Sequence, residues 1–141
     1  MRKMLFVFAC TAFIACVSPM LAACSRPAPE PTAAPAAAVT FAPVRDLLAQ
    51  SCGATCHSSE RKSAGLDLSA DKIWASLVKV ASTENPDQKL VVSGDPKASY
   101  LLAKIRGDQG IKGAQMPRGG APLGAEQQKL SEDWVAAGAP Q

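Results

Sequence analysis

One short stretch constrains this chain more than any other: Cys52-Gly53-Ala54-Thr55-Cys56-His57. It places two thiols and an imidazole within six residues, and its histidine is the only one in the sequence. On a helix, side chains three or four positions apart lie on one face, because each turn takes about 3.6 residues. We therefore expect Cys52 and Cys56 to face the same way, from a locally distorted helix.

The amino-terminal segment 1–23 is typical of a bacterial export signal. Arg2 and Lys3 supply a positive start, and no charge follows until after Ala23. The segment ends in Leu21-Ala22-Ala23-Cys24, which resembles the lipobox of bacterial lipoproteins. On this motif we expect a lipid anchor on Cys24. More than one acyl chain there would hold the protein firmly, since stable membrane attachment takes more than one chain. An uncleaved membrane anchor and plain secretion are the alternatives, and all three place the domain outside the cytoplasm. With the lipid anchor, we expect the domain at the cell envelope, facing the periplasm or the exterior.

Removing this signal leaves few chemically active side chains. Cys10 and Cys16 leave with it and Cys24 carries lipid, so Cys52 and Cys56 are the remaining thiols. Three of the four methionines also lie in the signal, which leaves only the methionine at position 116. In the haem-attachment pattern Cys-x-x-Cys-His, two thiols bond the porphyrin and the imidazole binds its iron. Here the thiols are one residue further apart, but the inventory matches one c-type haem.

The charge balance excludes some classes of function. The chain has 15 Lys and Arg against 12 Asp and Glu, and two of the basic residues belong to the signal. We expect no nucleic-acid binding, which needs a concentrated basic patch. With a single histidine and no paired acid and base, we also expect no independent enzyme.

Composition divides the mature chain into a tether and one domain. Segment 24–43 is rich in Ala and Pro, cannot bury a core and is expected to be semi-rigid. It serves either to reach a partner or to clear the membrane surface. The domain, 44–140, has four stretches of helical periodicity and no alternating stretch long enough for a sheet, although Val91 and Val92 favour a short extended piece. We predict an all-α bundle of about four helices wrapped around one haem, with helices near 44–51, 70–78, 95–106 and 125–137.

Helix boundaries follow from capping residues. Ser69 is the expected cap of the second helix, and Asp95-Pro96 is expected to open the third before Gly107 ends it. Gly138 is expected to stop the last helix.

A loop at 111–122 carries Met116. Pro117 restricts the preceding methionine to an extended conformation, which pre-sets its direction. A thioether held in this way can serve as the sixth iron ligand opposite His57, and His/Met ligation suits electron transfer. The alternative is a methionine that fills a gap in the core.

Taken together, these motifs resemble the single-haem class I cytochrome c fold. The six-residue stretch, Met116-Pro117 and a terminal helix appear in the order of that family, and the resemblance covers 44–140. It implies thioether bonds from Cys52 and Cys56 to the haem, axial iron ligation by His57 and Met116, and a place for Trp134 close to the haem. Many members orient the proximal histidine through a proline carbonyl, whereas this chain has no proline between His57 and Pro86.

Two further residues are candidates for bonds to haem propionates. Tyr100 lies on the third predicted helix, where the alternative is a core tyrosine with a hydrated hydroxyl. Arg118 lies beside the methionine, where the alternative is a solvated surface role.

The sequence thus predicts an electron-transfer protein on a lipid tether, with other redox proteins as partners. One alternative is a haem-free interaction module with a Cys52–Cys56 disulfide, which an oxidising compartment permits. Another is a haem sensor with an open sixth site, in which Met116 is only structural. A zinc site would need further Cys or His ligands.

Overall fold

The computed structural model describes residues 39–141, and the expected signal segment, Cys24 and most of the tether lie outside them. Four α-helices occur in the described part: α1 (Phe41–Leu48), α2 (Ile73–Leu77), α3 (Tyr100–Arg106) and α4 (Ala125–Ala136). A π-helical turn, η1 (Ala49–Gly53), continues α1, and a 3-10 turn, η2 (Ser63–Gly65), precedes α2. Two isolated bridges, Val78–Val91 and Ala81–Lys89, are the only β-type pairings there. The all-α class is therefore confirmed over residues 39–141.

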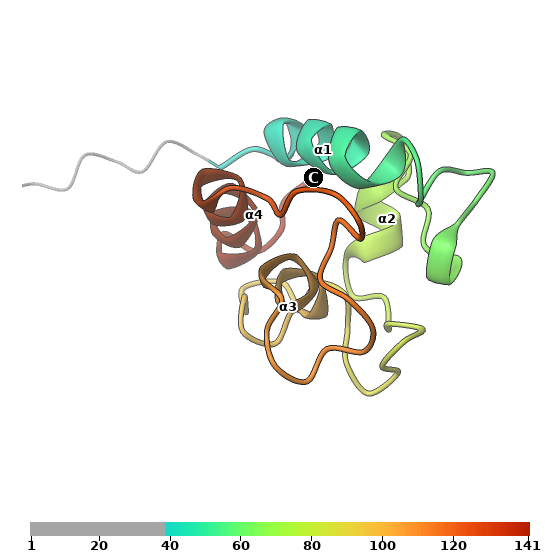
Figure 1. Ribbon diagram of the computed structural model, residues 1–141. Coiled ribbons are helices and arrows are strands. Elements are labelled where there is room, and N and C mark those ends of the chain that lie inside the picture. The colour runs from blue at the N-terminus through green and yellow to red at the C-terminus, as the bar shows by residue number, and fades with distance from the viewer. Residues whose placement is uncertain (1–38) are drawn as a thin grey trace, which may run out of the picture. The chain divides into compact units, whose positions relative to one another are not determined.

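The packing of α1 against α4 forms one side of the core (Figure 1). The ring of Phe41 stacks on Trp134 with their centroids 5.4 Å apart. Val44, Leu48 and Trp134 are fully buried. Residues 41–43, expected in the tether, are the first turn of α1, because Phe41 gains an aromatic partner by joining the helix.

Helix α3 begins at Tyr100, later than predicted. The carboxylate of Asp95 does accept two backbone bonds, from the amides of Lys97 and Ala98, at 3.0 Å each. These bonds close a turn rather than start a helix, a common use of aspartate. The end of the helix at Gly107 is as predicted, because this glycine takes the left-handed conformation at φ 76°.

Helix α2 is shorter than predicted and is not capped by Ser69. The hydroxyl of Ser69 instead lies 2.6 Å from the carboxylate of Asp67. Ile73 and Leu77 are fully buried and anchor the helix on the core.

Two indole groups fix the carboxyl-terminal tail. Helix α4 ends before Gly138, which has φ 96° and stops the helix as predicted. The indole N–H of Trp134 then donates to the carbonyl of Pro140 at 2.8 Å. That of Trp74, on α2, donates to the carbonyl of Ala139 at 2.9 Å. The tail is therefore held against two helices.

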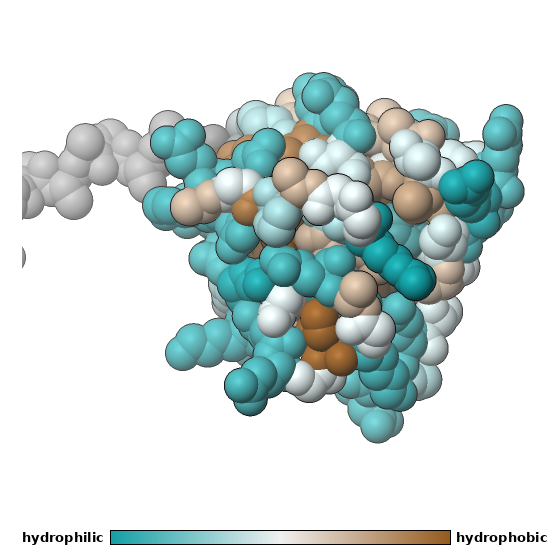
Figure 2. All heavy atoms as spheres, in the orientation of Figure 1, coloured by the Kyte–Doolittle hydropathy of each residue, from teal (hydrophilic) through white to brown (hydrophobic). Residues whose placement is uncertain are grey.

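On the face in Figure 2, hydrophilic residues cover much of the surface, and the most hydrophobic residues appear between them. Val80 is the one large hydrophobic residue classed as exposed within residues 39–141, at 38%. None of the helices in this range has the length and apolar character to cross a membrane.

Candidate functional site

A cavity of about 650 Å³ lies beside η1, and its size is in the range of roughly 300–1,000 Å³ usual for ligand and cofactor pockets. It gathers every predicted site residue of the described part except Trp134. These residues are Cys52, Cys56, His57, Tyr100, Met116 and Arg118. Residues separated by some sixty positions in the sequence thus meet at one cavity, as the haem hypothesis requires.

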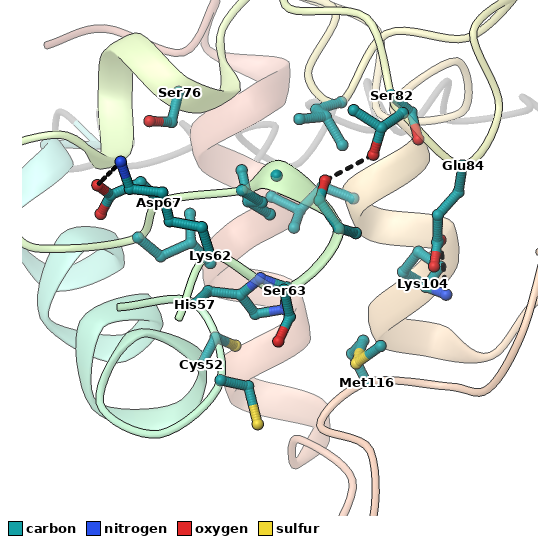
Figure 3. A pocket seen from close by; sticks show the side chains of 18 of the residues that line it. Cys52, His57, Lys62, Ser63, Asp67, Ser76, Ser82, Glu84, Lys104 and Met116 are labelled. Carbon is teal, nitrogen blue, oxygen red and sulfur yellow. Dashed lines mark hydrogen bonds and ion pairs between the residues drawn. The ribbon is translucent and has the colours of Figure 1, made fainter. Parts of the chain in front are cut away.

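The two groups of predicted ligands come from different parts of the fold. Figure 3 shows Cys52 and His57 on one side of the cavity, with Met116 across it on the loop between α3 and α4. Apolar side chains from several elements line the space between them. These are Leu66, Leu68, Val80, Leu90, Leu101 and Ile105. Polar side chains such as Lys62, Asp67 and Glu84 line the cavity as well, and its apolar part suits a large, flat apolar group.

The extra residue of the cysteine motif is accommodated by wide turns. The amide of Ala54 donates to the carbonyl of Ala49 at 2.9 Å, and that of His57 donates to the carbonyl of Cys52 at 3.1 Å. Both bonds span five residues instead of the four of an α-helix, and single π-turns of this kind hold one additional residue. Ala54 and Thr55 are exposed, and Thr55 also lines the cavity. The expected local distortion of the helix is therefore confirmed.

A close backbone contact fixes the inner side of this turn. A Cβ atom on Gly53 would lie 2.3 Å from the carbonyl oxygen of Leu68, so no residue with a side chain fits there without movement. The amide of Leu68 also donates to the carbonyl of His57 at 2.6 Å. Leu68 thus contacts the motif at both ends, and these contacts orient the backbone of His57.

Both cysteines of the described part are free thiols and half-buried. Burial, and to a smaller degree the neighbouring Cys56, raise the pKa of Cys52 to about 11. The Cys52 thiol is therefore protonated at neutral pH, as expected for a sulfur in apolar surroundings.

His57 is 8% exposed, and its Nδ1 atom is buried without a hydrogen-bond partner. It is the one buried side-chain nitrogen or oxygen within residues 39–141 that lacks a partner. Leaving such a group unpaired costs about 1–3 kcal/mol. No proline carbonyl bonds this ring, and the hydrogen bonds with Cys52 and Leu68 hold the backbone of His57 rather than its imidazole.

Asp67 organises the loop that carries Leu68, and the sequence analysis did not single it out. Its carboxylate accepts bonds from the hydroxyl and amide of Ser69, at 2.6 and 3.0 Å, and from the hydroxyl of Ser59 at 2.9 Å. Lys72 pairs with it at 3.5 Å. The bonds from Ser69 come first among the causes that hold the pKa of Asp67 well below its usual value. The pattern Asp67-Leu68-Ser69 was a readable signal, because aspartate often bonds the amide two residues ahead.

A second polar cluster lies beside Met116. Lys104 pairs with Glu84 at 2.9 Å, and the hydroxyl of Tyr100 donates to the same carboxylate at 3.3 Å. Both Lys104 and Glu84 line the cavity and were missed from the sequence. The available signal was the position of Lys104, four residues after Tyr100 on the apolar face of the predicted helix.

The two remaining predicted residues differ in position. Arg118 lines the cavity and is exposed. Trp134 is fully buried in the contact between α1 and α4 and does not line the cavity.

Within residues 39–141, no three His, Cys, Asp or Glu side chains are grouped so that they could hold a metal ion.

Comparison of the chain with protein-family models, with curated proteins and with solved structures finds no match.

Proposed function

We propose that this chain is an electron carrier of the bacterial cell envelope that holds one covalently bound c-type haem. The observation that supports it best is the single cavity that joins Cys52, Cys56, His57 and Met116. The proposed carrier passes electrons between other redox proteins and is not itself an enzyme.

The residues present fit such a group. The cavity offers two thiols and an imidazole on one wall and a thioether on another, between apolar side chains. The unpaired Nδ1 of His57 marks a ring whose polar atoms are not used by the protein's own hydrogen bonds. A buried polar atom without a partner is expected at a functional site rather than in an ordinary core.

Each residue has a definite part in the proposal. Cys52 and Cys56 would form the thioether bonds, and His57 and Met116 would bind the iron. When bound, the haem would supply a one-electron couple, and His/Met ligation raises its potential. Ligation of the iron by both His57 and Met116 would leave no open site for small molecules, which suits electron transfer.

The decisive experiment is expression of the exported chain together with a haem-attachment system. We expect the mass to rise by one haem, the haem to stay with the chain under denaturing conditions, and the pyridine haemochrome spectrum to indicate two thioether bonds. A single thioether would mean that the wide turn prevents one thiol from reacting. A mass equal to the bare chain less two protons would contradict the proposal and indicate a Cys52–Cys56 disulfide instead.

The distal ligand is tested by a matched pair of variants. Met116→Leu preserves apolar volume but removes the sulfur, so the ferric spectrum should lose its His/Met charge-transfer absorption and the potential should fall. Leu123→Met adds a methionine elsewhere and should change neither. If Met116→Leu leaves the spectrum unaltered, the sensor with an open sixth site becomes the better assignment.

Membrane attachment belongs to the same proposal. Cys24 lies outside the described residues, and its lipidation is inferred from the sequence alone. Labelling cells with a tagged fatty acid should mark the wild type and not Cys24→Ser. Labelling of both would rule out lipid at Cys24.

A further inference from the structure

The loop that carries Met116 is attached to the carboxyl-terminal end of α3. The amide of Met116 donates to the carbonyl of Lys104 at 2.9 Å, and the side-chain amide of Gln115 donates to the carbonyl of Ile105 at 2.8 Å. The last carbonyls of a helix have no partner within it. The loop therefore satisfies two groups that α3 leaves open.

The side chain of Lys104 makes a second attachment to the same loop. It is 8% exposed, and its ammonium group donates to the carbonyl of Lys112 at 2.6 Å while it pairs with Glu84 at 2.9 Å. Lys104 thus contacts the loop through its backbone at one end and its side chain at the other. Figure 3 shows this residue directly beside Met116.

Tyr100, one turn earlier on α3, completes the arrangement. Its hydroxyl accepts a bond from the amide of Lys112 at 2.9 Å and donates to Glu84 at 3.3 Å. Glu84 belongs to the segment between α2 and α3, so the cluster joins three parts of the chain around the cavity. Buried and connected polar groups of this kind hold one geometry more strictly than apolar contacts do.

We propose that Lys104, paired with the carboxylate of Glu84 that Tyr100 also bonds, is a positioning residue that fixes the thioether of Met116 at the cavity. The role of this sulfur as an iron ligand rests on the function proposed above, whereas the attachment of the loop to α3 does not.

The test compares Lys104→Met with Lys112→Met in the full chain as it is produced by cells with the haem-attachment system. Both variants remove one positive charge, and both keep their backbone groups. Only Lys104 uses its side chain in the cluster, because Lys112 contributes its amide and carbonyl. Hydrogen exchange of segment 112–116 and the affinity of the ferric protein for free imidazole, which competes for the sixth site, are the two readouts.

We expect Lys104→Met to speed exchange of the Met116 amide at least tenfold and to raise imidazole affinity at least tenfold, with Lys112→Met close to wild type. If the exchange rate does not change, or if it changes without any effect on imidazole binding, the inference is wrong. If the wild type carries no haem, the proposed function fails, and the exchange of the Met116 amide alone decides the role of Lys104.

Tyr100→Phe is the second variant in case Lys104→Met does not fold. It removes one hydroxyl but keeps the ion pair, so exchange and imidazole affinity should change in the same direction and by less. If Tyr100→Phe shows the wild-type exchange rate of the Met116 amide and the wild-type affinity for imidazole, the inference is overturned.

Discussion

Gly53 and Leu68 touch through their backbones: a Cβ on the glycine would come within 2.3 Å of the leucine carbonyl oxygen. The glycine follows Cys52, and the amide of Leu68 bonds the carbonyl of His57. The contact of the two backbones joins the turn of the cysteine motif to the segment of Leu68, which also lines the cavity. The geometry of the motif therefore depends on a residue without a side chain at this position.

Gly53→Ala should disturb the motif more than an ordinary glycine substitution. The backbone carbonyl cannot rotate away, so the turn must shift, and we expect a loss of about 1–3 kcal/mol in the free energy of unfolding. Gly120→Ala is the control, because the nearest atom to its added Cβ is 3.5 Å away. Denaturant unfolding measures both. Equal stabilities would mean that Leu68 moves freely and that the contact is unimportant.

Deletion of Thr55 should be tolerated. The residue is exposed although it lines the cavity, and its removal gives the standard spacing Cys-x-x-Cys-His. The bond from His57 to Cys52 would then span four residues, as in an α-helix. We expect the yield of haem-bound protein, measured by absorbance per chain, to stay within about twofold of the wild type. A deletion of Leu68 should abolish it, since that residue contacts both ends of the motif. Loss of haem on removing Thr55 would show that the wide turn is required rather than tolerated.

Asp67→Asn should flatten the response of stability to acid. The native pKa of Asp67 is held below its ordinary value of 3.8, first by Ser69. A lowered native pKa adds stability above the unfolded pKa, and that stability is lost as the pH falls toward the native pKa. The wild type should therefore lose more stability than the variant between about pH 6 and about pH 3. Melting temperatures across this range provide the measurement, with Asp71→Asn as the exposed control. Parallel curves for all three proteins would contradict the assignment.

Phe41→Leu tests whether the domain begins before residue 44. The substitution keeps an apolar side chain but removes the stacked ring, and aromatic pairs contribute about 0.5–1.5 kcal/mol beyond their buried area. We expect the melting temperature to fall by several degrees. Ala42→Leu, on the exposed side of α1, should not lower it. An unchanged value for Phe41→Leu would mean that the stack adds no stability.

Helical periodicity predicted the main elements because each buries a clear apolar face. Val44 and Leu48 on α1, and Trp134 on α4, are fully buried as expected. The starts of the helices were harder to predict. Asp95 and Ser69 were both read as helix caps, but Asp95 bonds the amides of a turn and Ser69 bonds the carboxylate of Asp67. A side chain that can bond two nearby amides gives the same sequence signal for a turn and for a helix.

The candidate ligands were found from the inventory of rare residues, whereas only the folded chain shows that they meet at one cavity. The supporting polar residues could not be found in this way. Lys104 and Glu84 are 20 positions apart in the sequence, and only the folded loops show that they pair. The contact of Gly53 with Leu68 is equally a property of two backbones, for which residue type gives little warning.

The exposed positions of Ala54 and Thr55 also bear on how such sites are recognised in genomes. Text patterns count residues between cysteines, whereas Cys52, Cys56 and His57 line one cavity although their motif has one residue more than the standard spacing. A search with a fixed spacing would pass over this chain. A three-dimensional template of these three residues with Met116 would retrieve it, together with any protein that brings the same side chains to one cavity.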